Sequence, residues 1–340
     1  MFPPTPLAPP PWIVPFAVPL ADPGRVALQS LLAPGAGPRD GGLPNLRHLL
    51  SRVLVAEPAD VGPETSLSPP HERALARALG WSAGDGRLPM AAWQAADDGI
   101  DGGIDGTASD LAWGLLTPVQ WHVGTEQVGL VDPQSLMLDA AESRALFEAV
   151  RPLFVSEGFV AVWGAPLRWY LAHESLADLA TASLDRVIGR NVDVWLGAAR
   201  DQPALKRLHR LQAEMQMLLY RHPLTESRQA RGLPAVNSFW LSGCGVAQPS
   251  PATSPSLETA LRRDALAGDW AAWAKAFEQF DASGLADAAA AVARGEALSL
   301  VLCGERGARR FATPARPPGL WDRLQRRLAP PEPWSFLEPL

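Results

Sequence analysis

Short apolar runs that suit β-strands alternate along this chain with segments whose apolar residues recur at helical spacing. The first run begins at Trp12, and a helical pattern containing Leu46, Leu49 and Val53 follows it. Further strand-like runs lie around residues 111–123, 128–131, 159–163, 236–242 and 298–302, with helical patterns at 68–80, 139–150, 205–218, 257–266 and 270–280. Such alternation is typical of folds in which helices cover the faces of a sheet. We therefore expect an α/β protein.

The size and charge of the chain exclude several classes of protein. Its 340 residues are 47% apolar, which is enough to bury one large domain or two of ordinary size. The net charge is -6, so no overall positive field attracts nucleic acid or anionic lipid. The apolar stretch from Trp12 to Leu20 is short and interrupted by Pro15 and Pro19, so we predict neither a signal peptide nor a membrane span. Nucleic acid and membranes are accordingly not expected as partners.

The cysteines and histidines give no metal or redox motif. Cys244 and Cys303 are the two cysteines, and they cannot form a disulfide framework or a Cys-rich metal site. A reducing cytoplasm suits this usage. None of the spacings of a zinc site occurs among His71, His122, His173 and His222. The sequence predicts no bound metal and no cofactor.

Two capping signals mark where helices begin. Ser68 precedes Pro69, an arrangement that suits an N-cap followed by the first helical residue. Asp139 and Glu142 form a capping box, from which we expect a helix to about Val150.

The densest group of polar side chains flanks the amphipathic helix expected over residues 205–218. Its cationic and hydrogen-bonding members are Arg186, Arg190, His222, Arg228, Arg231 and Asn237. Guanidinium groups match the oxygens of phosphate or carboxylate bidentately, so the group predicts a small anionic ligand. We expect the four arginines to clamp the anion, His222 and Asn237 to donate hydrogen bonds, and Trp240 or Trp121 to form a wall. In the alternative interpretation, Asp185–Arg186 and Glu226–Arg228 are surface ion pairs that fix loops.

Three further motifs are weaker signals. Residues 243–245, Gly-Cys-Gly, could offer backbone N–H groups to a phosphate, although a tight turn is the simpler interpretation. The loop over residues 97–110 contains four aspartates that could be considered as cation ligands: Asp97, Asp98, Asp101 and Asp105. Their spacing is not that of a calcium loop, so we interpret the loop as solvated. Cys303 lies within an apolar run and is expected in the core.

Three stretches of the chain resemble a known family. They are ASLDRVIGRNVDVWL (182–196), LQAEMQMLLYRHPLTESRQARG (211–232) and VNSFWLSGCG (236–245). The family is the bacterial one labelled RpfE-type regulatory protein and archaeal-type cofactor-independent phosphoglycerate mutase. The resemblance spans roughly residues 10–310 and implies an alkaline-phosphatase-like core sheet flanked by helices, with a smaller α/β domain inserted. We expect residues 1–115 plus 236–340 to form the core domain and residues 116–235 the inserted one.

The chain departs from the family where metal ligands belong. The resemblance implies two divalent ions that activate a serine and hold a phosphoryl group through carboxylate and imidazole ligands. The first strand is not followed by the family's Asp-Gly pair, and Glu305 and Arg306 stand where Asp and His are expected. Arg306 and Arg309 would oppose metal binding by like charge. Ser66 and Ser68 lie near the nucleophile's position, and the N-cap role is the simpler account of Ser68.

Together these features predict a cytoplasmic, non-catalytic or weakly active protein with a regulatory role. It would bind a phosphorylated or other anionic small molecule in a cleft between the two domains. One alternative is an active, metal-dependent phosphoglycerate mutase or phosphatase. The other is a protein-interaction scaffold whose proline-rich termini, including residues 314–340, and exposed tryptophans contact a protein partner.

Overall fold

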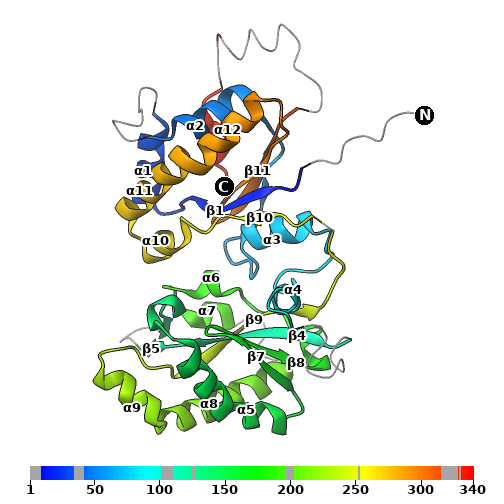
Figure 1. Cartoon of the computed structure of the whole chain (residues 1–340), viewed down its shortest axis with the longest axis vertical. Coiled ribbons are helices and arrows are strands. Elements are labelled where there is room, and N and C mark those ends of the chain that lie inside the picture. The colour runs from blue at the N-terminus through cyan, green and yellow to red at the C-terminus, as the bar shows by residue number, and fades with distance from the viewer. Residues whose placement is uncertain are drawn as a thin grey trace, which may run out of the picture. The chain divides into compact units, whose positions relative to one another are not determined.

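The computed structural model describes residues 9–33, 42–100, 110–123, 128–196, 203–251, 253–314, 328 and 331–340. Asp101, Asp105 and residues 315–327 of the proline-rich tail lie outside the described residues. The chain divides into two compact units (Figure 1). The first comprises residues 1–64, 70–80 and 250–340, and the second comprises residues 65–69 and 81–249. Both units combine sheet and helices, which confirms the expected α/β class.

The first unit contains a mixed sheet. Its strands are β1 (Trp12–Val18), β2 (Val55–Ala56), β3 (Asp60–Val61), β10 (Ser256–Leu257), β11 (Ser299–Gly304) and β12 (Gly307–Ala312). The order is β10-β1-β11-β12-β2, and β3 also pairs with β12. β10, β1 and β11 are parallel, whereas β12 runs antiparallel to β11, β2 and β3.

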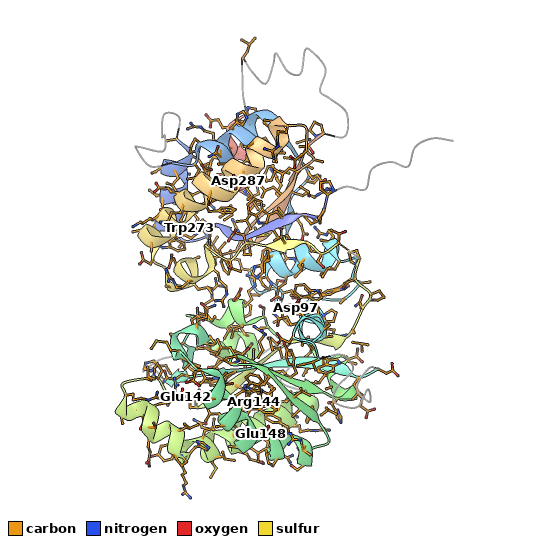
Figure 2. The ribbon with its side chains drawn as sticks, viewed as in Figure 1. Asp97, Glu142, Arg144, Glu148, Trp273 and Asp287 are labelled. Atoms are coloured by element: carbon orange, nitrogen blue, oxygen red, sulfur yellow. The ribbon has the colours of Figure 1, made fainter. Side chains whose placement is uncertain are left out.

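Helices pack on this sheet through apolar stripes. They are α1 (Asp22–Leu32), α2 (Pro44–His48), α3 (Pro70–Ala78), α10 (Arg262–Ala267), α11 (Trp270–Phe280), α12 (Ala286–Ala293) and α14 (Pro333–Leu337), with π-helical turns η1 (Leu49–Val53) and η5 (Asp281–Leu285). In α11, Trp273, Phe277 and Phe280 recur at spacings of four and three residues, so they share one face of the helix. All three are buried in the core of this unit, where Figure 2 labels Trp273.

The carboxyl ends of β1 and β11 lie side by side. The register between them shifts within β1, which resumes pairing with Val18 opposite Gly304. At the irregularity Phe16 adopts a φ of +57°, and Trp273 Nε1 donates to its carbonyl oxygen at 3.0 Å. The core tryptophan therefore supports this bend in the strand.

The second unit is built on an antiparallel sheet. Its strands are β4 (Ala112–Val119), β7 (Val160–Ala165), β8 (Arg168–Ala172) and β9 (Ser238–Val246), in the order β7-β8-β4-β9. β5 (Trp121–Val123) and β6 (Val128–Leu130) form a separate two-stranded ribbon. The helices are α4 (Met90–Asp97), α5 (Ala140–Ser156), α6 (Leu184–Val187), α7 (Val192–Leu196), α8 (Pro203–Tyr220) and α9 (Pro223–Ala230), with short 3₁₀ turns η2 (Pro133–Leu136) and η3 (Glu174–Leu176).

The helices α5 and α8 bury their apolar faces with this sheet. Asp139 accepts the Glu142 N–H at 2.8 Å, as the capping box predicts. The helix continues to Ser156 rather than ending near Val150. Phe147 of α5 and Met215 of α8 share one core cluster with the strand residue Phe239. Of the helices in the described residues, none has the length and apolarity that a membrane crossing requires.

The division between the units differs from the expected boundaries at residues 115/116 and 235/236. β4 pairs with β9 from Ala112 opposite Val246 to Val119 opposite Ser238. Two strands joined by this many hydrogen bonds belong to one sheet, and both lie in the second unit. The second unit accordingly extends to residue 249.

The Gly-Cys-Gly sequence at 243–245 lies inside β9 and is not the expected tight turn. The register with β4 shifts there, so two residues of β9 bulge from the ladder. Gly243 has a φ of +65°, the left-handed conformation that glycine adopts in such bulges. A Cβ at this position would lie 2.9 Å from the backbone N of Ala91. The glycine therefore permits the close approach of α4.

Candidate ligand-binding site

Every side chain that the sequence predicts for the ligand site lies in the second unit, and two of the four arginines meet at Glu142, which Figure 2 labels. Arg228 is 1% exposed and donates to Glu142 Oε2, to the Leu136 carbonyl and, at 3.0 Å, to the Pro234 carbonyl. Arg231 donates to Glu142 Oε1. These contacts fasten α9 to the first turn of α5.

Glu142 pairs with both arginines within the protein, and its single negative charge offsets one of their two positive charges. The alternative interpretation named Glu226 as the partner of Arg228, but the acceptor is Glu142. A carboxylate in the first turn of a helix is also stabilised by the helix dipole. Arg228 has three protein acceptors, so its role in this structure is to hold the fold together.

His222 and Asn237 also make contacts that position the backbone. His222 Nδ1 accepts the Leu224 N–H at 3.2 Å and caps α9. Asn237 Oδ1 accepts the Trp121 N–H at 2.8 Å, and Asn237 Nδ2 donates to the Trp121 carbonyl at 3.0 Å. Asn237 thus reproduces the pairing of a strand residue and holds Trp121 in place.

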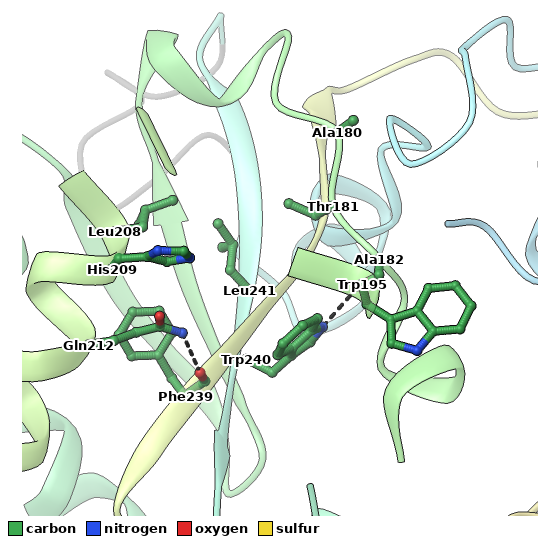
Figure 3. A pocket seen from close by; sticks show the side chains of 10 residues that line it. All are labelled: Ala180, Thr181, Ala182, Trp195, Leu208, His209, Gln212, Phe239, Trp240 and Leu241. Atoms are coloured by element: carbon green, nitrogen blue, oxygen red, sulfur yellow. Dashed lines mark hydrogen bonds between the residues drawn. The ribbon is translucent and has the colours of Figure 1, made fainter. Parts of the chain in front are cut away.

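Two adjoining hollows lie beside α8 and β9, and we call them together the α8–β9 site. The first, shown in Figure 3, has a volume of about 30 Å³ and is lined by Ala180, Thr181, Ala182, Trp195, Leu208, His209, Gln212, Phe239, Trp240 and Leu241. The second has a volume of about 240 Å³ and is lined by Trp121, His209, Gln212, Ala213, Gln216 and Ser238. His209 and Gln212 line both hollows and therefore join them.

The polar side chains of the α8–β9 site come from one side of α8. His209, Gln212 and Gln216 are separated by three and four residues, which places them on the same side of a helix. Sequence analysis did not single them out. Their signal is a polar row directly beside the apolar stripe that includes Leu208 and Met215, both of which are buried.

The outer edge of β9 is open to the site because β9 is the last strand of the sheet. Pro118 of β4 stands opposite Phe239 and has no N–H to donate. The main-chain groups of Phe239 therefore face away from β4. Gln212 Nε2 donates to the Phe239 carbonyl at 3.0 Å, as the dashed line in Figure 3 shows. That bond fixes the orientation of the Gln212 amide at the junction of the hollows.

Tryptophan side chains line both hollows of the α8–β9 site, Trp195 and Trp240 the first and Trp121 the second. Trp240 is 3% exposed, and its Nε1 donates to the Ala182 carbonyl at 2.9 Å. Arg186 is buried, and its guanidinium lies 6.0 Å from the centre of the Trp195 ring. Arg190 lies in the turn after α6. Arg186 is thus a predicted arginine whose guanidinium lies over a tryptophan ring that lines the site.

Ser66 and Ser68 surround a carboxylate in the same unit. Ser66 Oγ donates to Asp85 Oδ1 at 2.9 Å, and the Leu67 and Ser68 N–H groups donate to the same carboxylate at 2.8 Å. Burial opposes ionisation of Asp85, but these hydrogen bonds outweigh it and lower the pKa of the carboxyl. Ser68 Oγ accepts the Gly86 N–H at 2.8 Å. Both serines are buried and stabilise a loop.

Asp98 does not lie free in a solvated loop. It accepts two hydrogen bonds from Arg168, at 2.8 and 2.6 Å, and one from the Tyr170 hydroxyl at 2.5 Å. The hydrogen bond from Arg168 is the main reason that the pKa of Asp98 is lowered. This carboxylate is committed to the protein and does not form part of a cation site.

The two-metal centre that the resemblance implies does not fit the described residues. Where the first strand ends, Glu305 Oε1 accepts the Leu20 N–H at 3.1 Å, and the cationic Arg306 follows it. Within the described ranges, no three side chains of His, Cys, Asp or Glu gather in a way that could hold a metal ion. A divalent ion needs such ligands, so no reaction step is assigned to metals here.

A larger hollow of about 740 Å³ lies in the first unit. Six prolines contribute to its lining: Pro9, Pro10, Pro11, Pro58, Pro251 and Pro255. Its two arginines are paired, Arg310 with Glu57 at 2.7 Å and Arg77 with Asp60 at 2.8 Å. Its cations are therefore neutralised by neighbouring carboxylates.

Comparison with known proteins places the chain beside two solved structures. No family model matches the chain, and no curated protein matches it. It is similar to the cofactor-independent phosphoglycerate mutase from Thermoplasma acidophilum DSM 1728, with 13% identity and a TM-score of 0.34 over 88% of this chain and 89% of that one. It is also similar to the PH0037 protein from Pyrococcus horikoshii, with 12% identity and a TM-score of 0.42 over 90% of this chain and 88% of that one.

Proposed function

We propose that this protein binds a small anionic molecule, such as a phosphorylated or carboxylated metabolite, in the α8–β9 site without transforming it. The observation that carries the proposal is the junction of the two hollows at His209 and Gln212, between walls formed by tryptophans. Concave sites with rigid aromatic walls and a few oriented polar groups are the usual form of small-molecule sites.

The volume of the site suits a small ligand. The first hollow has a volume of about 30 Å³ and the second, larger one of about 240 Å³. A phosphate or carboxylate on a short carbon chain is a ligand of this size class.

The charge of the lining supports an anion. None of the described residues that line either hollow is acidic. Arg186 lies against Trp195, and the His209 ring can donate a hydrogen bond through an N–H group. Arg228 and Arg231 are not part of the proposed site because they are bound to Glu142.

The proposal of binding without catalysis is supported by the surroundings of the two serines. A phosphoryl-transfer serine must be accessible and activated. Ser66 and Ser68 are 5% and 2% exposed, and their hydroxyls bond to a carboxylate and a backbone N–H. We also propose a reducing, cytoplasmic setting, which the two free, buried cysteines support.

Isothermal titration calorimetry with inorganic phosphate and with short phosphorylated and carboxylated acids tests the proposed function. We expect saturable binding that His209→Ala and Gln216→Ala each weaken about tenfold, which corresponds to about 1.4 kcal/mol for a lost hydrogen bond to a charged group. Lys206→Ala is the matched control, because it removes an exposed cation from the same helix outside the site. Binding that is unaffected by either site variant, or no binding by any of these anions, rejects the proposal.

A further inference from the structure

The turn between β11 and β12 in the first unit holds an oxygen atom from another part of the chain. The N–H groups of Arg306 and Gly307 both donate to the main-chain oxygen of Leu340, at 2.9 and 3.0 Å. Successive backbone N–H groups that converge on one oxygen form a concavity that binds anionic oxygens. We call residues 304–307 the hairpin nest.

Cations with unused hydrogen-bonding capacity lie at the hairpin nest and on the strand that follows it. Arg306 Nε and Arg309 Nε are buried atoms without a hydrogen-bond acceptor in the described part of the chain. A buried donor of this kind gains stability when it finds an acceptor, although the Arg306 side chain as a whole is 37% exposed. The nearest recorded carboxylate partner of Arg306 is Glu64, at 3.8 Å from Nη1. An anion would satisfy donors that the protein leaves unsatisfied.

The hairpin nest lies at the edge of the sheet where open α/β proteins usually bind their ligands. β1 and β11 are parallel, and Gly304 lies opposite Val18 where both strands end. Open α/β sheets bind ligands outside the carboxyl ends of their parallel strands. A Cβ on Gly304 would lie 2.5 Å from the Leu340 oxygen and 3.0 Å from the Val18 oxygen, so the tail is seated directly on this edge.

The segment over residues 331–340, which we call the tail, is held in this place by side chains. Leu337 and Leu340 are buried in the core of the first unit, and Phe336 packs edge-on against Phe311 at 6.0 Å. The guanidinium of Arg309 lies 6.0 Å from the centre of the Phe336 ring. Figure 1 shows this end of the chain beside β1 and β11. The tail therefore covers the nest and one of the unsatisfied arginines together.

We propose that the hairpin nest is a binding site for an oxyanion, a phosphate or a carboxylate group, and that the tail occupies it as an internal competitor. The Leu340 oxygen stands in for one oxygen of the ligand. The backbone N–H groups of Arg306 and Gly307 bind the anion, and the Arg306 side chain supplies the positive charge. This site is independent of the α8–β9 site, because all of its residues lie in the first unit.

Deletion of residues 331–340 tests the proposal, with binding of inorganic phosphate and of acetate measured by calorimetry in the His209→Ala background. That background weakens the α8–β9 site, so a gain in binding reports on the nest. We expect the deletion to strengthen binding of at least one anion by about tenfold, because the tail no longer lowers the fraction of molecules whose nest is free to bind. Arg306→Ala in the shortened chain should abolish the gain, and the two anions identify whether the ligand group is phosphate or carboxylate.

A second variant keeps the test decisive if the shortened chain does not fold. Phe336→Ala in the full chain removes the contacts with Phe311 and Arg309 and leaves Leu337 and Leu340 in place. It should raise anion affinity in the same direction by a smaller factor, and Arg306→Ala should cancel the effect. A folded deletion chain or a folded Phe336→Ala chain that binds neither anion more tightly overturns the proposal.

Discussion

Arg228 and Glu142, which are 86 residues apart in the sequence, form a buried ion pair in the second unit. Their side chains are 1% and 11% exposed. Arg228 belongs to α9 and Glu142 to the first turn of α5, so the pair joins two helices that the backbone alone would not hold together. The arginine that the sequence assigns to a ligand is thus bound to its own protein.

Replacing Arg228 should destabilise the fold far more than replacing Arg231. Arg228→Ala leaves the Leu136 and Pro234 carbonyls without their donor and Glu142 paired with Arg231 alone, and breaking such a buried ion pair costs about 3 to 5 kcal/mol. Arg231 is about half exposed, so Arg231→Ala should cost less than about 1 kcal/mol. Urea unfolding of both variants measures the difference. Equal losses would show that the pair at Arg228 is no stronger than a surface ion pair.

Replacing Gly243 should cost more than replacing another glycine with the same backbone conformation. Gly243→Ala places a Cβ 2.9 Å from the Ala91 N and 3.0 Å from the Met90 Cβ, and its φ is +65°. Strain and displacement of α4 should together cost about 2 to 4 kcal/mol. Gly232→Ala is the control, because its φ is +70° but no atom lies within 4 Å. It should cost about 1 kcal/mol in the free energy of unfolding.

The stability of the second unit should depend on the ionisation of Asp85. Its pKa is lowered in the folded protein, so its ionised form contributes stability above its ordinary pKa of about 3.9. That contribution is lost as the pH falls through the lower, folded pKa. Asp85→Asn should therefore reduce stability by about 1 kcal/mol at pH 7, a figure that allows for the partial exposure of the side chain.

The loss of stability caused by Asp85→Asn should depend on pH, and this dependence tests the role of the ionised carboxylate. Urea unfolding should show that the difference between wild type and Asp85→Asn shrinks as the pH falls from 7 to below the ordinary carboxyl pKa of about 3.9 and on through the lower, folded pKa. Asp178→Asn is the control, because that side chain is 94% exposed and should change stability little at either pH. A difference that stays constant with pH would contradict the role given to the Asp85 hydrogen bonds.

Both cysteines should be protected from thiol reagents while the protein is folded. Cys244 and Cys303 are completely buried, and burial raises the pKa of the Cys244 thiol to about 12. At pH 8 the reactive thiolate is then about a thousandfold less populated than in an ordinary cysteine. Ellman's reagent should label neither residue before unfolding and both after it. Rapid labelling of the folded protein would contradict this burial.

Much of the fold follows from local patterns in the sequence. The apolar runs predict β1, β9 and β11, and the spacing of apolar residues predicts α8 and α11. β12 escapes notice because Arg309 and Arg310 lie within it and weaken its apolar signal. β8 is missed for another reason: it is only five residues long and opens with Arg168, so its apolar run is short.

The candidate site depends on contacts that no local pattern reveals. The sequence analysis predicts Trp240 or Trp121 as a wall, which stays a prediction, and it assigns Arg228 to a ligand because Glu142 lies far away along the chain. Asn237 shows the same limit, since its amide bonds to Trp121 across 116 residues. His209 and Gln212 are visible only as a polar row beside an apolar stripe, which is also the ordinary appearance of a helix surface.

Pro118 opposite Phe239 has a consequence for how this protein behaves when concentrated. An exposed strand margin normally recruits a neighbouring molecule and seeds aggregation. Here Gln212 donates a hydrogen bond to the Phe239 carbonyl, so a side chain occupies the acceptor that an additional strand would use. The helix α8, which lines the proposed α8–β9 site, thereby also discourages a second molecule from extending the sheet at this point.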